Sequence, residues 1–213
     1  MAAAPDSLLR ALRRYVSDAR VLAAMAAVPR DRFVPEGLRG QAWENAPLPI
    51  GAGQTISQPL VVARMCEVLE LDGGETVLDV GTGSGYHAAV LARLARQVYS
   101  IEVHESLSYQ AAANLAAAGV DNVTLTVGDG SRGLPEYAPY QAINVAAAAG
   151  GAVPPALTDQ LAPGGRLVAP VENGDQRLVV ARRTPEGLTV TDLERVRFVP
   201  LVDPSGRSAG GPP

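Results

Sequence analysis

The sequence predicts an α/β protein with a doubly wound, mostly parallel sheet, preceded by helices and closed by an antiparallel edge. The first observation is a buried strand pattern at residues 76–80 that runs directly into a glycine-rich turn. The second is a regular alternation of strand and helix patterns after that turn. Sheets of this kind bind ligands at the carboxyl ends of their strands, so functional residues are expected there.

The elements are predicted in order along the chain. Apolar residues at three- and four-residue steps predict amphipathic helices over residues 6–15 and 19–27, and Pro29 ends the second. Residues 29–59 are rich in proline and glycine, which predicts an irregular segment, and loops of that length tend to be functional. The predicted strands are 76–80, 98–102, 123–127, 142–146, 164–170, 177–183 and 196–201, and the predicted helices after Pro59 are 61–69, 87–95, 105–118 and 155–161.

Composition excludes some classes of function. The formal net charge of −4 leaves no basic stripe to neutralise phosphates, which argues against nucleic acid as the main partner. The single cysteine, Cys66, lies in an apolar helical pattern that favours a buried small side chain over a catalytic thiol. The first residues carry charges and no sustained apolar run, so we expect no secretory signal and no membrane span. We expect a cytoplasmic monomer without a bound metal.

The glycine-rich turn predicts a nucleoside cofactor. Its residues are Gly81, Thr82, Gly83, Ser84 and Gly85, and the three glycines let the backbone approach a ligand closely. A dinucleotide fold also has a turn of this kind, so the spacing must decide between the two classes of ligand.

A dinucleotide fingerprint requires G-x-G-x-x-G facing a pyrophosphate, but Tyr86 stands where its third glycine would be. Asp79, near the end of the strand, would repel a pyrophosphate and suits a cationic ligand. S-adenosyl-L-methionine carries an ammonium and a sulfonium and no phosphate, so this pattern favours it. The run D-x-G-x-G-x-G resembles motif I of the class I methyltransferases.

Two further acidic residues follow neighbouring strands. Glu102 ends the strand 98–102, where a carboxylate can accept hydrogen bonds from both ribose hydroxyls. Asp129, followed by Gly130, comes after the strand 123–127, where it can accept a bond from the adenine amino group. Either acid alone could be a solvated loop residue or a helix cap, but three acids at successive strand ends favour one ligand site.

Several runs together resemble one family. They are V-P-R-D-R-F-V-P from Val28, L-P-I-G from Leu48, Q-T-I-S-Q-P from Gln54, the glycine turn, Gly128-Asp129-Gly130, Q-L-x-x-G-G from Gln160 and R-F-V-P-L from Arg197. The chain resembles the bacterial protein-L-isoaspartate O-methyltransferases over residues 20–202. The glycine element occurs in many methyltransferases, whereas Q-T-I-S-Q-P is highly specific to this family.

The resemblance implies a seven-stranded Rossmann-like methyltransferase sheet in a single domain over residues 1–202. Within it, residues 1–58 would hold the N-terminal helices and the substrate loop, and residues 59–202 the cofactor-binding core. Residues 203–213 are rich in glycine, proline and serine and are expected to be disordered. The implied reaction transfers the methyl group of S-adenosyl-L-methionine to the α-carboxylate of an L-isoaspartyl residue, leaving S-adenosyl-L-homocysteine, and the ester then closes to a succinimide during repair.

The resemblance also implies roles for the substrate loop. Ser57 would orient the attacking carboxylate, and Gln54, Thr55, Ile56 and Pro59 would line or fix the same channel. The alternative role for Ser57 is the N-cap of a helix that starts near Pro59, and both roles could hold together.

The chain departs from the family pattern P-F-D-A-I-I-V-T-A-A, because it has P-Y-Q-A-I-N-V-A-A-A from Pro139. Gln141 replaces an acid and Ala146 a hydroxyl, both expected near the place where substrate and donor meet. Three alternatives therefore stay open: an enzyme that methylates an aspartate of one dedicated peptide, a small-molecule methyltransferase, and a cofactor-binding protein without activity.

Overall fold

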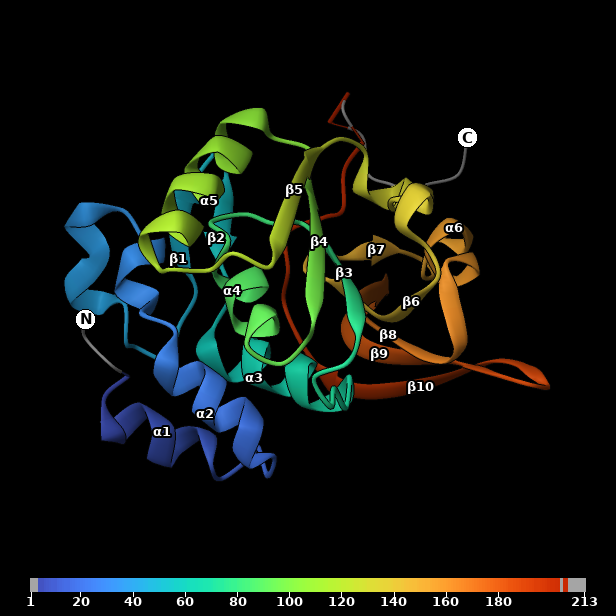
Figure 1. The fold of residues 1–213 in the computed structure, drawn as a ribbon, viewed down its shortest axis with the longest axis horizontal. Coiled ribbons are helices and arrows are strands. Elements are labelled where there is room, and N and C mark those ends of the chain that lie inside the picture. Colours follow the sequence, from blue (N-terminus) through green and yellow to red (C-terminus); the bar gives the residue numbers. More distant parts are fainter. Residues whose placement is uncertain (1–3, 204, 207–213) are drawn as a thin grey trace.

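The computed structural model describes residues 4–203, 205 and 206. Helices gather at the N-terminal side and a long twisted sheet extends away from them (Figure 1).

The α-helices are α1 (Asp6–Leu12), α2 (Ala19–Ala27), α3 (Pro59–Val68), α4 (Tyr86–Ala92), α5 (Glu105–Ala117) and α6 (Pro155–Asp159). The 3-10 helices are η1 (Arg30–Phe33), η2 (Glu36–Gln41), η3 (Gly130–Arg132) and η4 (Pro135–Tyr137). The strands are β1 (Leu48–Gly51), β2 (Gln54–Ile56), β3 (Thr76–Val80), β4 (Gln97–Glu102), β5 (Val123–Val127), β6 (Tyr140–Val145), β7 (Ala149–Gly150), β8 (Leu161–Asn173), β9 (Asp175–Thr184) and β10 (Gly187–Arg195).

The main sheet has the order β10-β9-β8-β6-β3-β4-β5, with β7 paired to β8 beside this path. Strands β8, β6, β3, β4 and β5 pair in parallel, and β9 and β10 are antiparallel. This confirms the predicted doubly wound sheet with an antiparallel edge. The central strand β3 is rich in apolar residues because both of its faces are covered.

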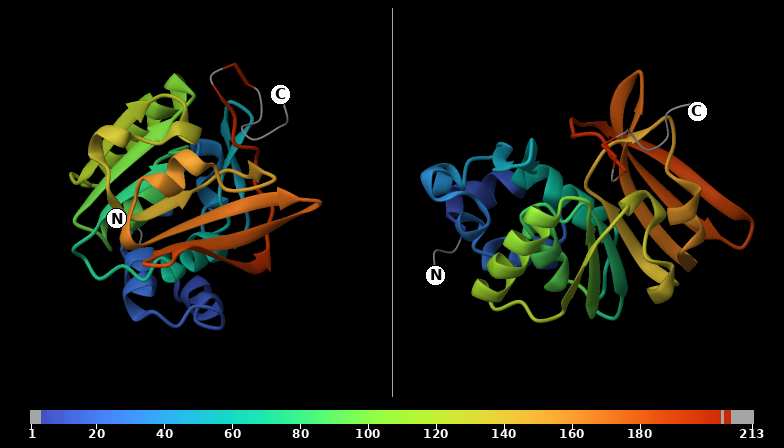
Figure 2. Two further views of the ribbon diagram at one scale, coloured as in Figure 1. Left: turned by 90° about the vertical axis from the view of Figure 1, so that its right-hand side faces the viewer. Right: turned by 90° about the horizontal axis from the view of Figure 1, so that it is seen from above.

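Two apolar clusters lie on opposite faces of the sheet. Val77 points to the cluster formed with α1 to α5, whereas its neighbour Leu78 points to the cluster formed with Leu134 and Leu157. Figure 2 shows the helices on one side of the sheet and the shorter α6 on the other. Because both faces are covered, the carboxyl ends of the parallel strands remain the accessible edge.

The prediction for residues 29–59 was wrong, because this segment contains η1, η2 and a hairpin of β1 and β2. The hairpin turn is built by Gly51, Ala52 and Gly53, which all have positive φ angles, so two glycines relieve the strain. The irregular backbone before it is held by the buried side chain of Arg30, a long-range contact that no local pattern shows.

The predicted strand 196–201 was also wrong. The antiparallel edge is formed instead by β10, which the sequence analysis did not assign. The segment after β10 makes separate hydrogen bonds: Val196 N–H donates to Gln176 O at 3.0 Å, Ala148 N–H to Val199 O at 2.8 Å, and Leu201 N–H to Ala148 O at 2.8 Å. It therefore leaves the sheet edge and crosses back over the strand ends.

Most other elements agree with the prediction within a few residues, and α2 and β5 agree at both ends. The tail expected to be disordered lies mainly outside the described residues; Gly206 N–H donates to Asp203 O at 2.8 Å within a turn. None of the described helices has the length and apolar composition that a bilayer span requires. The single-domain assignment and the division at residue 58 stay predictions.

Candidate active site

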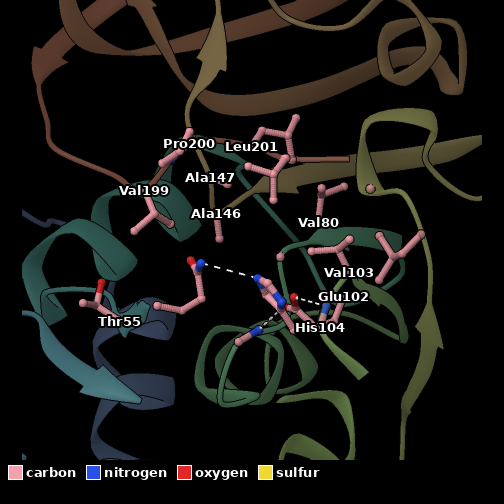
Figure 3. Close-up of a pocket in the computed structure, with 16 residues that line it drawn as sticks. Thr55, Val80, Glu102, Val103, His104, Ala146, Ala147, Val199, Pro200 and Leu201 are labelled. Carbon is pink, nitrogen blue, oxygen red and sulfur yellow. Dashed lines mark hydrogen bonds between the residues drawn. The ribbon is translucent and has the colours of Figure 1, made fainter. Parts of the chain in front are cut away.

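A cavity opens at the carboxyl ends of β3 and β4, where the sheet topology predicts a ligand. Figure 3 shows Glu102 and His104 across this cavity from Val199, Pro200 and Leu201. The site residues from the sequence that line it are Gln54, Thr55, Gly81, Gly83, Glu102 and Gly130. The cavity therefore brings together the hairpin, the glycine turn and the end of β4, and we call it the donor cavity.

Two glycines near the donor cavity, Gly83 in the glycine turn and Gly130 after β5, have close neighbours at the position a Cβ would occupy. Gly83 has φ +54°, and a Cβ placed on it would lie 3.2 Å from Ile50 Cδ1. A Cβ on Gly130 would lie 2.6 Å from Val80 Cγ1. A side chain at Gly130 would clash with Val80, which lines the cavity, whereas one at Gly83 would require Ile50 to move by a few tenths of an ångström, at a positive φ that favours glycine.

Glu102 is fixed at the wall of the donor cavity. The residue is 5% exposed, and its carboxylate accepts hydrogen bonds from Gly83 N–H at 2.8 Å and His104 N–H at 2.9 Å. Each oxygen has a further lone pair, so the same carboxylate can accept from hydroxyl groups of a ligand. The imidazole Nε2 of His104 also lies 3.5 Å from Gln54 Nε2, across the cavity (Figure 3).

Asp79 lies beneath the glycine turn and does not line the donor cavity. It is fully buried, and its oxygens accept from Ser100 Oγ and Asn144 Nδ2, both at 2.7 Å. Burial raises the pKa of this carboxyl to about 6, although the two hydrogen bonds lower it and the charge of Glu102 raises it further. A direct contact between Asp79 and the donor stays a prediction.

His87 extends this buried polar chain. Its Nδ1 lies 3.2 Å from Asn144 Nδ2 and its Nε2 lies 3.5 Å from Cys66 Sγ. Burial lowers the pKa of the imidazole to about 3, so the ring is neutral and Nδ1 accepts from the amide. Cys66 is buried, and burial raises the pKa of its thiol, which agrees with the expected apolar role and not with a nucleophile.

The remaining turn residues support the cavity without lining it. Thr82 is buried with its Oγ1 2.6 Å from Ser100 Oγ, and Ser84 is buried with its carbonyl oxygen accepting from Asn114. Gly85 is the N-cap of α4 at φ 87°. Asp129 caps η3, accepting from Ser131 N–H at 3.0 Å, so the capping role considered for it is confirmed and its contact with adenine stays a prediction.

The loop that carries Ser57 is held by Arg30. The guanidinium of Arg30 is fully buried and donates to the carbonyl oxygens of Ala42, Ala46 and Ser57, the last two at 3.1 and 3.0 Å. It also lies 5.6 Å from the centre of the Tyr86 ring. Burial lowers the pKa of Arg30, and three carbonyl partners offset the cost of burying its charge.

The alternative in which Ser57 caps a helix was wrong. Helix α3 begins with Pro59 as its first residue, and its N-cap residue, Gln58, makes no side-chain capping bond. The side chain of Asn45 serves instead, since its Oδ1 accepts from Leu60 N–H at 3.0 Å. Ile56 and Pro59 are buried, and Gln54 and Thr55 line the donor cavity. The side chain of Ser57 is therefore free of a capping bond and lies in a second cavity, which we call the Ser57 groove.

The Ser57 groove has a volume of about 430 Å³ and adjoins the donor cavity. Both are lined by Thr55, Ala146 and Val199. A smaller cavity between them is lined by Ser57, the turn residues 81–84 and His87. The two main cavities thus meet at a shared wall, which is the arrangement required for transfer between two bound molecules.

Several site residues were not assigned from the sequence. The donor cavity is also lined by Val103, His104, Ala147 and residues 199–202. Of these, only residues 199–201 had a signal in the sequence, because they belong to the R-F-V-P-L run. The position expected for Gln141 was wrong: it lies at the start of β6 and accepts from Thr76 N–H at 2.8 Å, at the opposite end of the strand from the cavities. Ala146 lies where it was expected.

The charge of the donor-cavity lining suits a nucleoside donor without phosphate. The chain contains no lysine, and no arginine is among the described residues that line the cavity, so these residues offer no cation to a pyrophosphate. One fixed carboxylate, that of Glu102, faces the cavity instead. The fold and the site define an S-adenosyl-L-methionine-dependent methyltransferase.

Comparison with known proteins identifies the family. The family model described as protein-L-isoaspartate(D-aspartate) O-methyltransferase matches residues 4–206. This chain belongs to the protein-L-isoaspartate(D-aspartate) O-methyltransferase family.

Similar proteins cover most of the chain. Protein-L-isoaspartate O-methyltransferase 1 of Rhodopseudomonas palustris is 52% identical over 93% of this chain and 82% of its own length. Protein-L-isoaspartate O-methyltransferase 2 of Marinobacter nauticus is 53% identical over 91% of this chain and 89% of its own length.

Solved structures share the fold. A protein-L-isoaspartate O-methyltransferase superposes with a TM-score of 0.83 at 28% identity, covering 97% of this chain and 66% of that chain. A beta-aspartate methyltransferase from Plasmodium falciparum, in complex with S-adenosyl-L-homocysteine, superposes with a TM-score of 0.82 at 27% identity, covering 92% of this chain and 96% of that chain.

Proposed function

We propose that this chain methylates the α-carboxylate of L-isoaspartyl residues in proteins and peptides, with S-adenosyl-L-methionine as the methyl donor. The observation that carries this proposal is the family match over residues 4–206, combined with two cavities that meet beside Ser57. The resulting ester closes to a succinimide, which begins repair of the damaged linkage. No observation favours a dedicated partner peptide.

In this proposal the donor cavity holds the nucleoside. Glu102 accepts hydrogen bonds from the ribose hydroxyls, and the glycine turn makes room for the methionine moiety of the donor. Asp129 and Gly130 contact the adenine. Asp79 supports the turn through the hydroxyls of Ser100 and Thr82. The bound donor supplies an electrophilic methyl group on a sulfonium.

The acceptor needs no general base. A carboxylate has an ordinary pKa near 4 and is already ionised at neutral pH, so it attacks the methyl carbon directly. The carbon–sulfur bond breaks with its electron pair remaining on sulfur, and no proton is transferred. The protein must therefore only position the two molecules and exclude water.

We propose that Ser57 supplies this positioning by donating a hydrogen bond to the attacking carboxylate. Its location in the groove that adjoins the donor cavity supports this role. Thr55, at the shared wall, and Gln54, Ile56 and Pro59 would shape the channel around it.

The test compares an isoaspartyl peptide with the same peptide containing a normal L-aspartyl residue, using donor with a labelled methyl group. The proposal expects base-labile methyl ester on the isoaspartyl peptide and none above background on its twin. Equal rates on the two peptides would contradict it. The variant Gly83→Val, which we expect to lose donor binding, is the negative control.

A further inference from the structure

The Ser57 groove is positively charged in a chain of net charge −4. Its charged lining residues are Arg195 and Arg197, and no acidic residue is among the described residues that line it. Apolar side chains, including Val61 and Phe198, form much of the remaining wall. A groove of this composition favours an extended peptide segment that carries negative charge.

The two arginines differ in their partners. Arg195 Nε forms an ion pair with Asp175 at 2.7 Å. The side chain of Arg197 is exposed and has no hydrogen bond or ion pair with any residue in the described part of the chain. Arg197 is thus the guanidinium of the groove that is available to a ligand.

The backbone around Arg197 is fixed by Gln176 on β9. Val196 N–H donates to Gln176 O at 3.0 Å, and Phe198 N–H donates to Gln176 Oε1 at 2.6 Å. Gln176 Nε2 in turn donates to Phe198 O at 3.2 Å. Because the residues on both sides are tied to β9, Arg197 is held at the groove wall, where it lies among the lining residues together with Ser57.

We propose that Arg197 binds a second carboxylate of the substrate peptide, so that the enzyme prefers isoaspartyl peptides with a negative charge near the damaged residue. This inference rests on the proposed function and adds a substrate class to it. The second carboxylate comes from an acidic side chain or from a free C-terminus. A guanidinium binds either group with paired, charge-assisted hydrogen bonds.

The second carboxylate fits Arg197 better than the reacting one. The reacting carboxylate loses its charge when it is methylated, so a guanidinium bound to it would stabilise the ground state and slow transfer. A second carboxylate keeps its charge throughout the reaction and is bound equally before and during transfer. Its contact with Arg197 should therefore change KM and leave kcat nearly constant.

The experiment measures kcat and KM at saturating donor for isoaspartyl peptides with amidated C-termini. The peptides carry Glu, Gln or Lys at one position next to the isoaspartyl residue, and the series is made once for the preceding and once for the following position. We expect the KM of the Glu peptide to be about three- to tenfold below that of the Lys peptide, the scale of a partly exposed charge pair. A Gln peptide with a free C-terminus tests the other source of the carboxylate.

Variants assign the preference to one residue. Arg197→Gln should remove the difference between the peptides, and Arg197→Glu should reverse it, while kcat stays within about twofold. Arg93→Gln is the matched control, because Arg93 is also exposed and is the C-cap residue after α4, away from the groove lining. Thermal unfolding checks that each variant is folded.

Equal KM values for all peptides with the unmodified enzyme, or an unchanged preference in Arg197→Glu, would overturn the role of Arg197. The proposed function would then still stand, because isoaspartyl peptides would be methylated. Failure to methylate any of the peptides, by enzyme that binds the donor, would instead contradict the proposed function and remove the basis of this inference.

Discussion

The guanidinium of Arg30 donates a hydrogen bond to the carbonyl oxygen of Ser57 at 3.0 Å. The two residues are 27 positions apart in the sequence: Arg30 begins η1, and Ser57 directly follows β2. Since the same guanidinium also binds Ala42 O and Ala46 O, it fixes the approach to the hairpin and the loop after it as one unit. The position of Ser57 therefore depends on a buried charge that is not among the described residues lining either cavity.

Replacing Arg30 should damage both stability and activity. Arg30→Gln leaves buried carbonyl oxygens without their donor, and we expect a loss of roughly 2–5 kcal/mol in the free energy of unfolding. Turnover should fall at temperatures where the variant is still folded, because Ser57 is no longer held. Chemical denaturation and steady-state kinetics measure the two effects. Arg32→Gln is the control, since Arg32 is exposed and donates only to Ala117 O on the surface; equal losses in both variants would refute the special role of Arg30.

Ser57 and Glu102 should affect different kinetic constants. If Ser57 orients the acceptor, Ser57→Ala should keep donor affinity within a few-fold and lower kcat by roughly one to two orders of magnitude, the scale of one charge-assisted hydrogen bond. Glu102→Ala should raise the KM for the donor and be partly rescued by saturating donor. Calorimetry with S-adenosyl-L-homocysteine and kinetics with an isoaspartyl peptide separate the two. Full turnover in Ser57→Ala would show that its hydroxyl has no part in transfer.

A side chain at Gly83 should abolish donor binding. The Cβ of Gly83→Val would lie 3.2 Å from Ile50 Cδ1, at a φ angle of +54° that a β-branched residue disfavours. We expect no measurable binding of S-adenosyl-L-homocysteine by calorimetry. Gly37→Val is the matched control, because Gly37 is exposed and has nothing within 4 Å of its Cβ position. Normal binding by Gly83→Val would contradict the location of the donor.

The buried pair Asp79 and His87 should give opposite pH dependences of stability. His87 has a pKa of about 3 in the folded protein and an ordinary value of 6.5, so the unfolded state binds the extra proton and stability falls as pH decreases from about 6.5. Asp79 has a pKa of about 6 against an ordinary 3.8, so the folded state binds the extra proton and stability falls as pH increases from about 3.8 to 6.

Single variants separate the two contributions. His87→Gln should lose the destabilisation that His87 causes at low pH and keep the destabilisation that Asp79 causes as pH rises. Relative to the unmodified protein, its free energy of unfolding should therefore decrease as pH rises from about 4 to 6. Asp79→Asn should show a steeper increase over the same range. Urea unfolding at several pH values measures both slopes, and identical slopes in all three proteins would rule out this assignment.

Local patterns predicted the parallel sheet and the donor side of the site well. Strand β3, the glycine turn and Glu102 lie in one short stretch, so the continuous apolar pattern of a buried strand and the glycine spacing were sufficient. The errors occurred where long-range contacts determine the structure. Arg30 orders residues that resemble an irregular loop. Residues 196–198 have a composition typical of a strand, but separate hydrogen bonds to Gln176, one of them to its side chain, tie them to β9 in place of a strand ladder.

Asp79 shows the same limit within the site. Its place in the motif is evident from the sequence, but the orientation of its carboxylate depends on Asn144 and Ser100, which come from the two strands on either side of β3. No pattern within β3 could predict that both neighbours would supply a donor. The sequence thus located the site and could not predict which of its acids face the ligand.

The segment from Val199 to Val202 supplies one wall of the donor cavity and is tied to Ala148 by two backbone hydrogen bonds. The opposite wall, with Glu102, is complete nearly a hundred residues earlier in the chain. A nascent or prematurely terminated chain that ends before this segment would contain every motif of the cofactor site and still have an open cavity. We therefore expect donor affinity to depend on the segment from Val199 to Val202 although it contains none of the nucleoside-binding motifs.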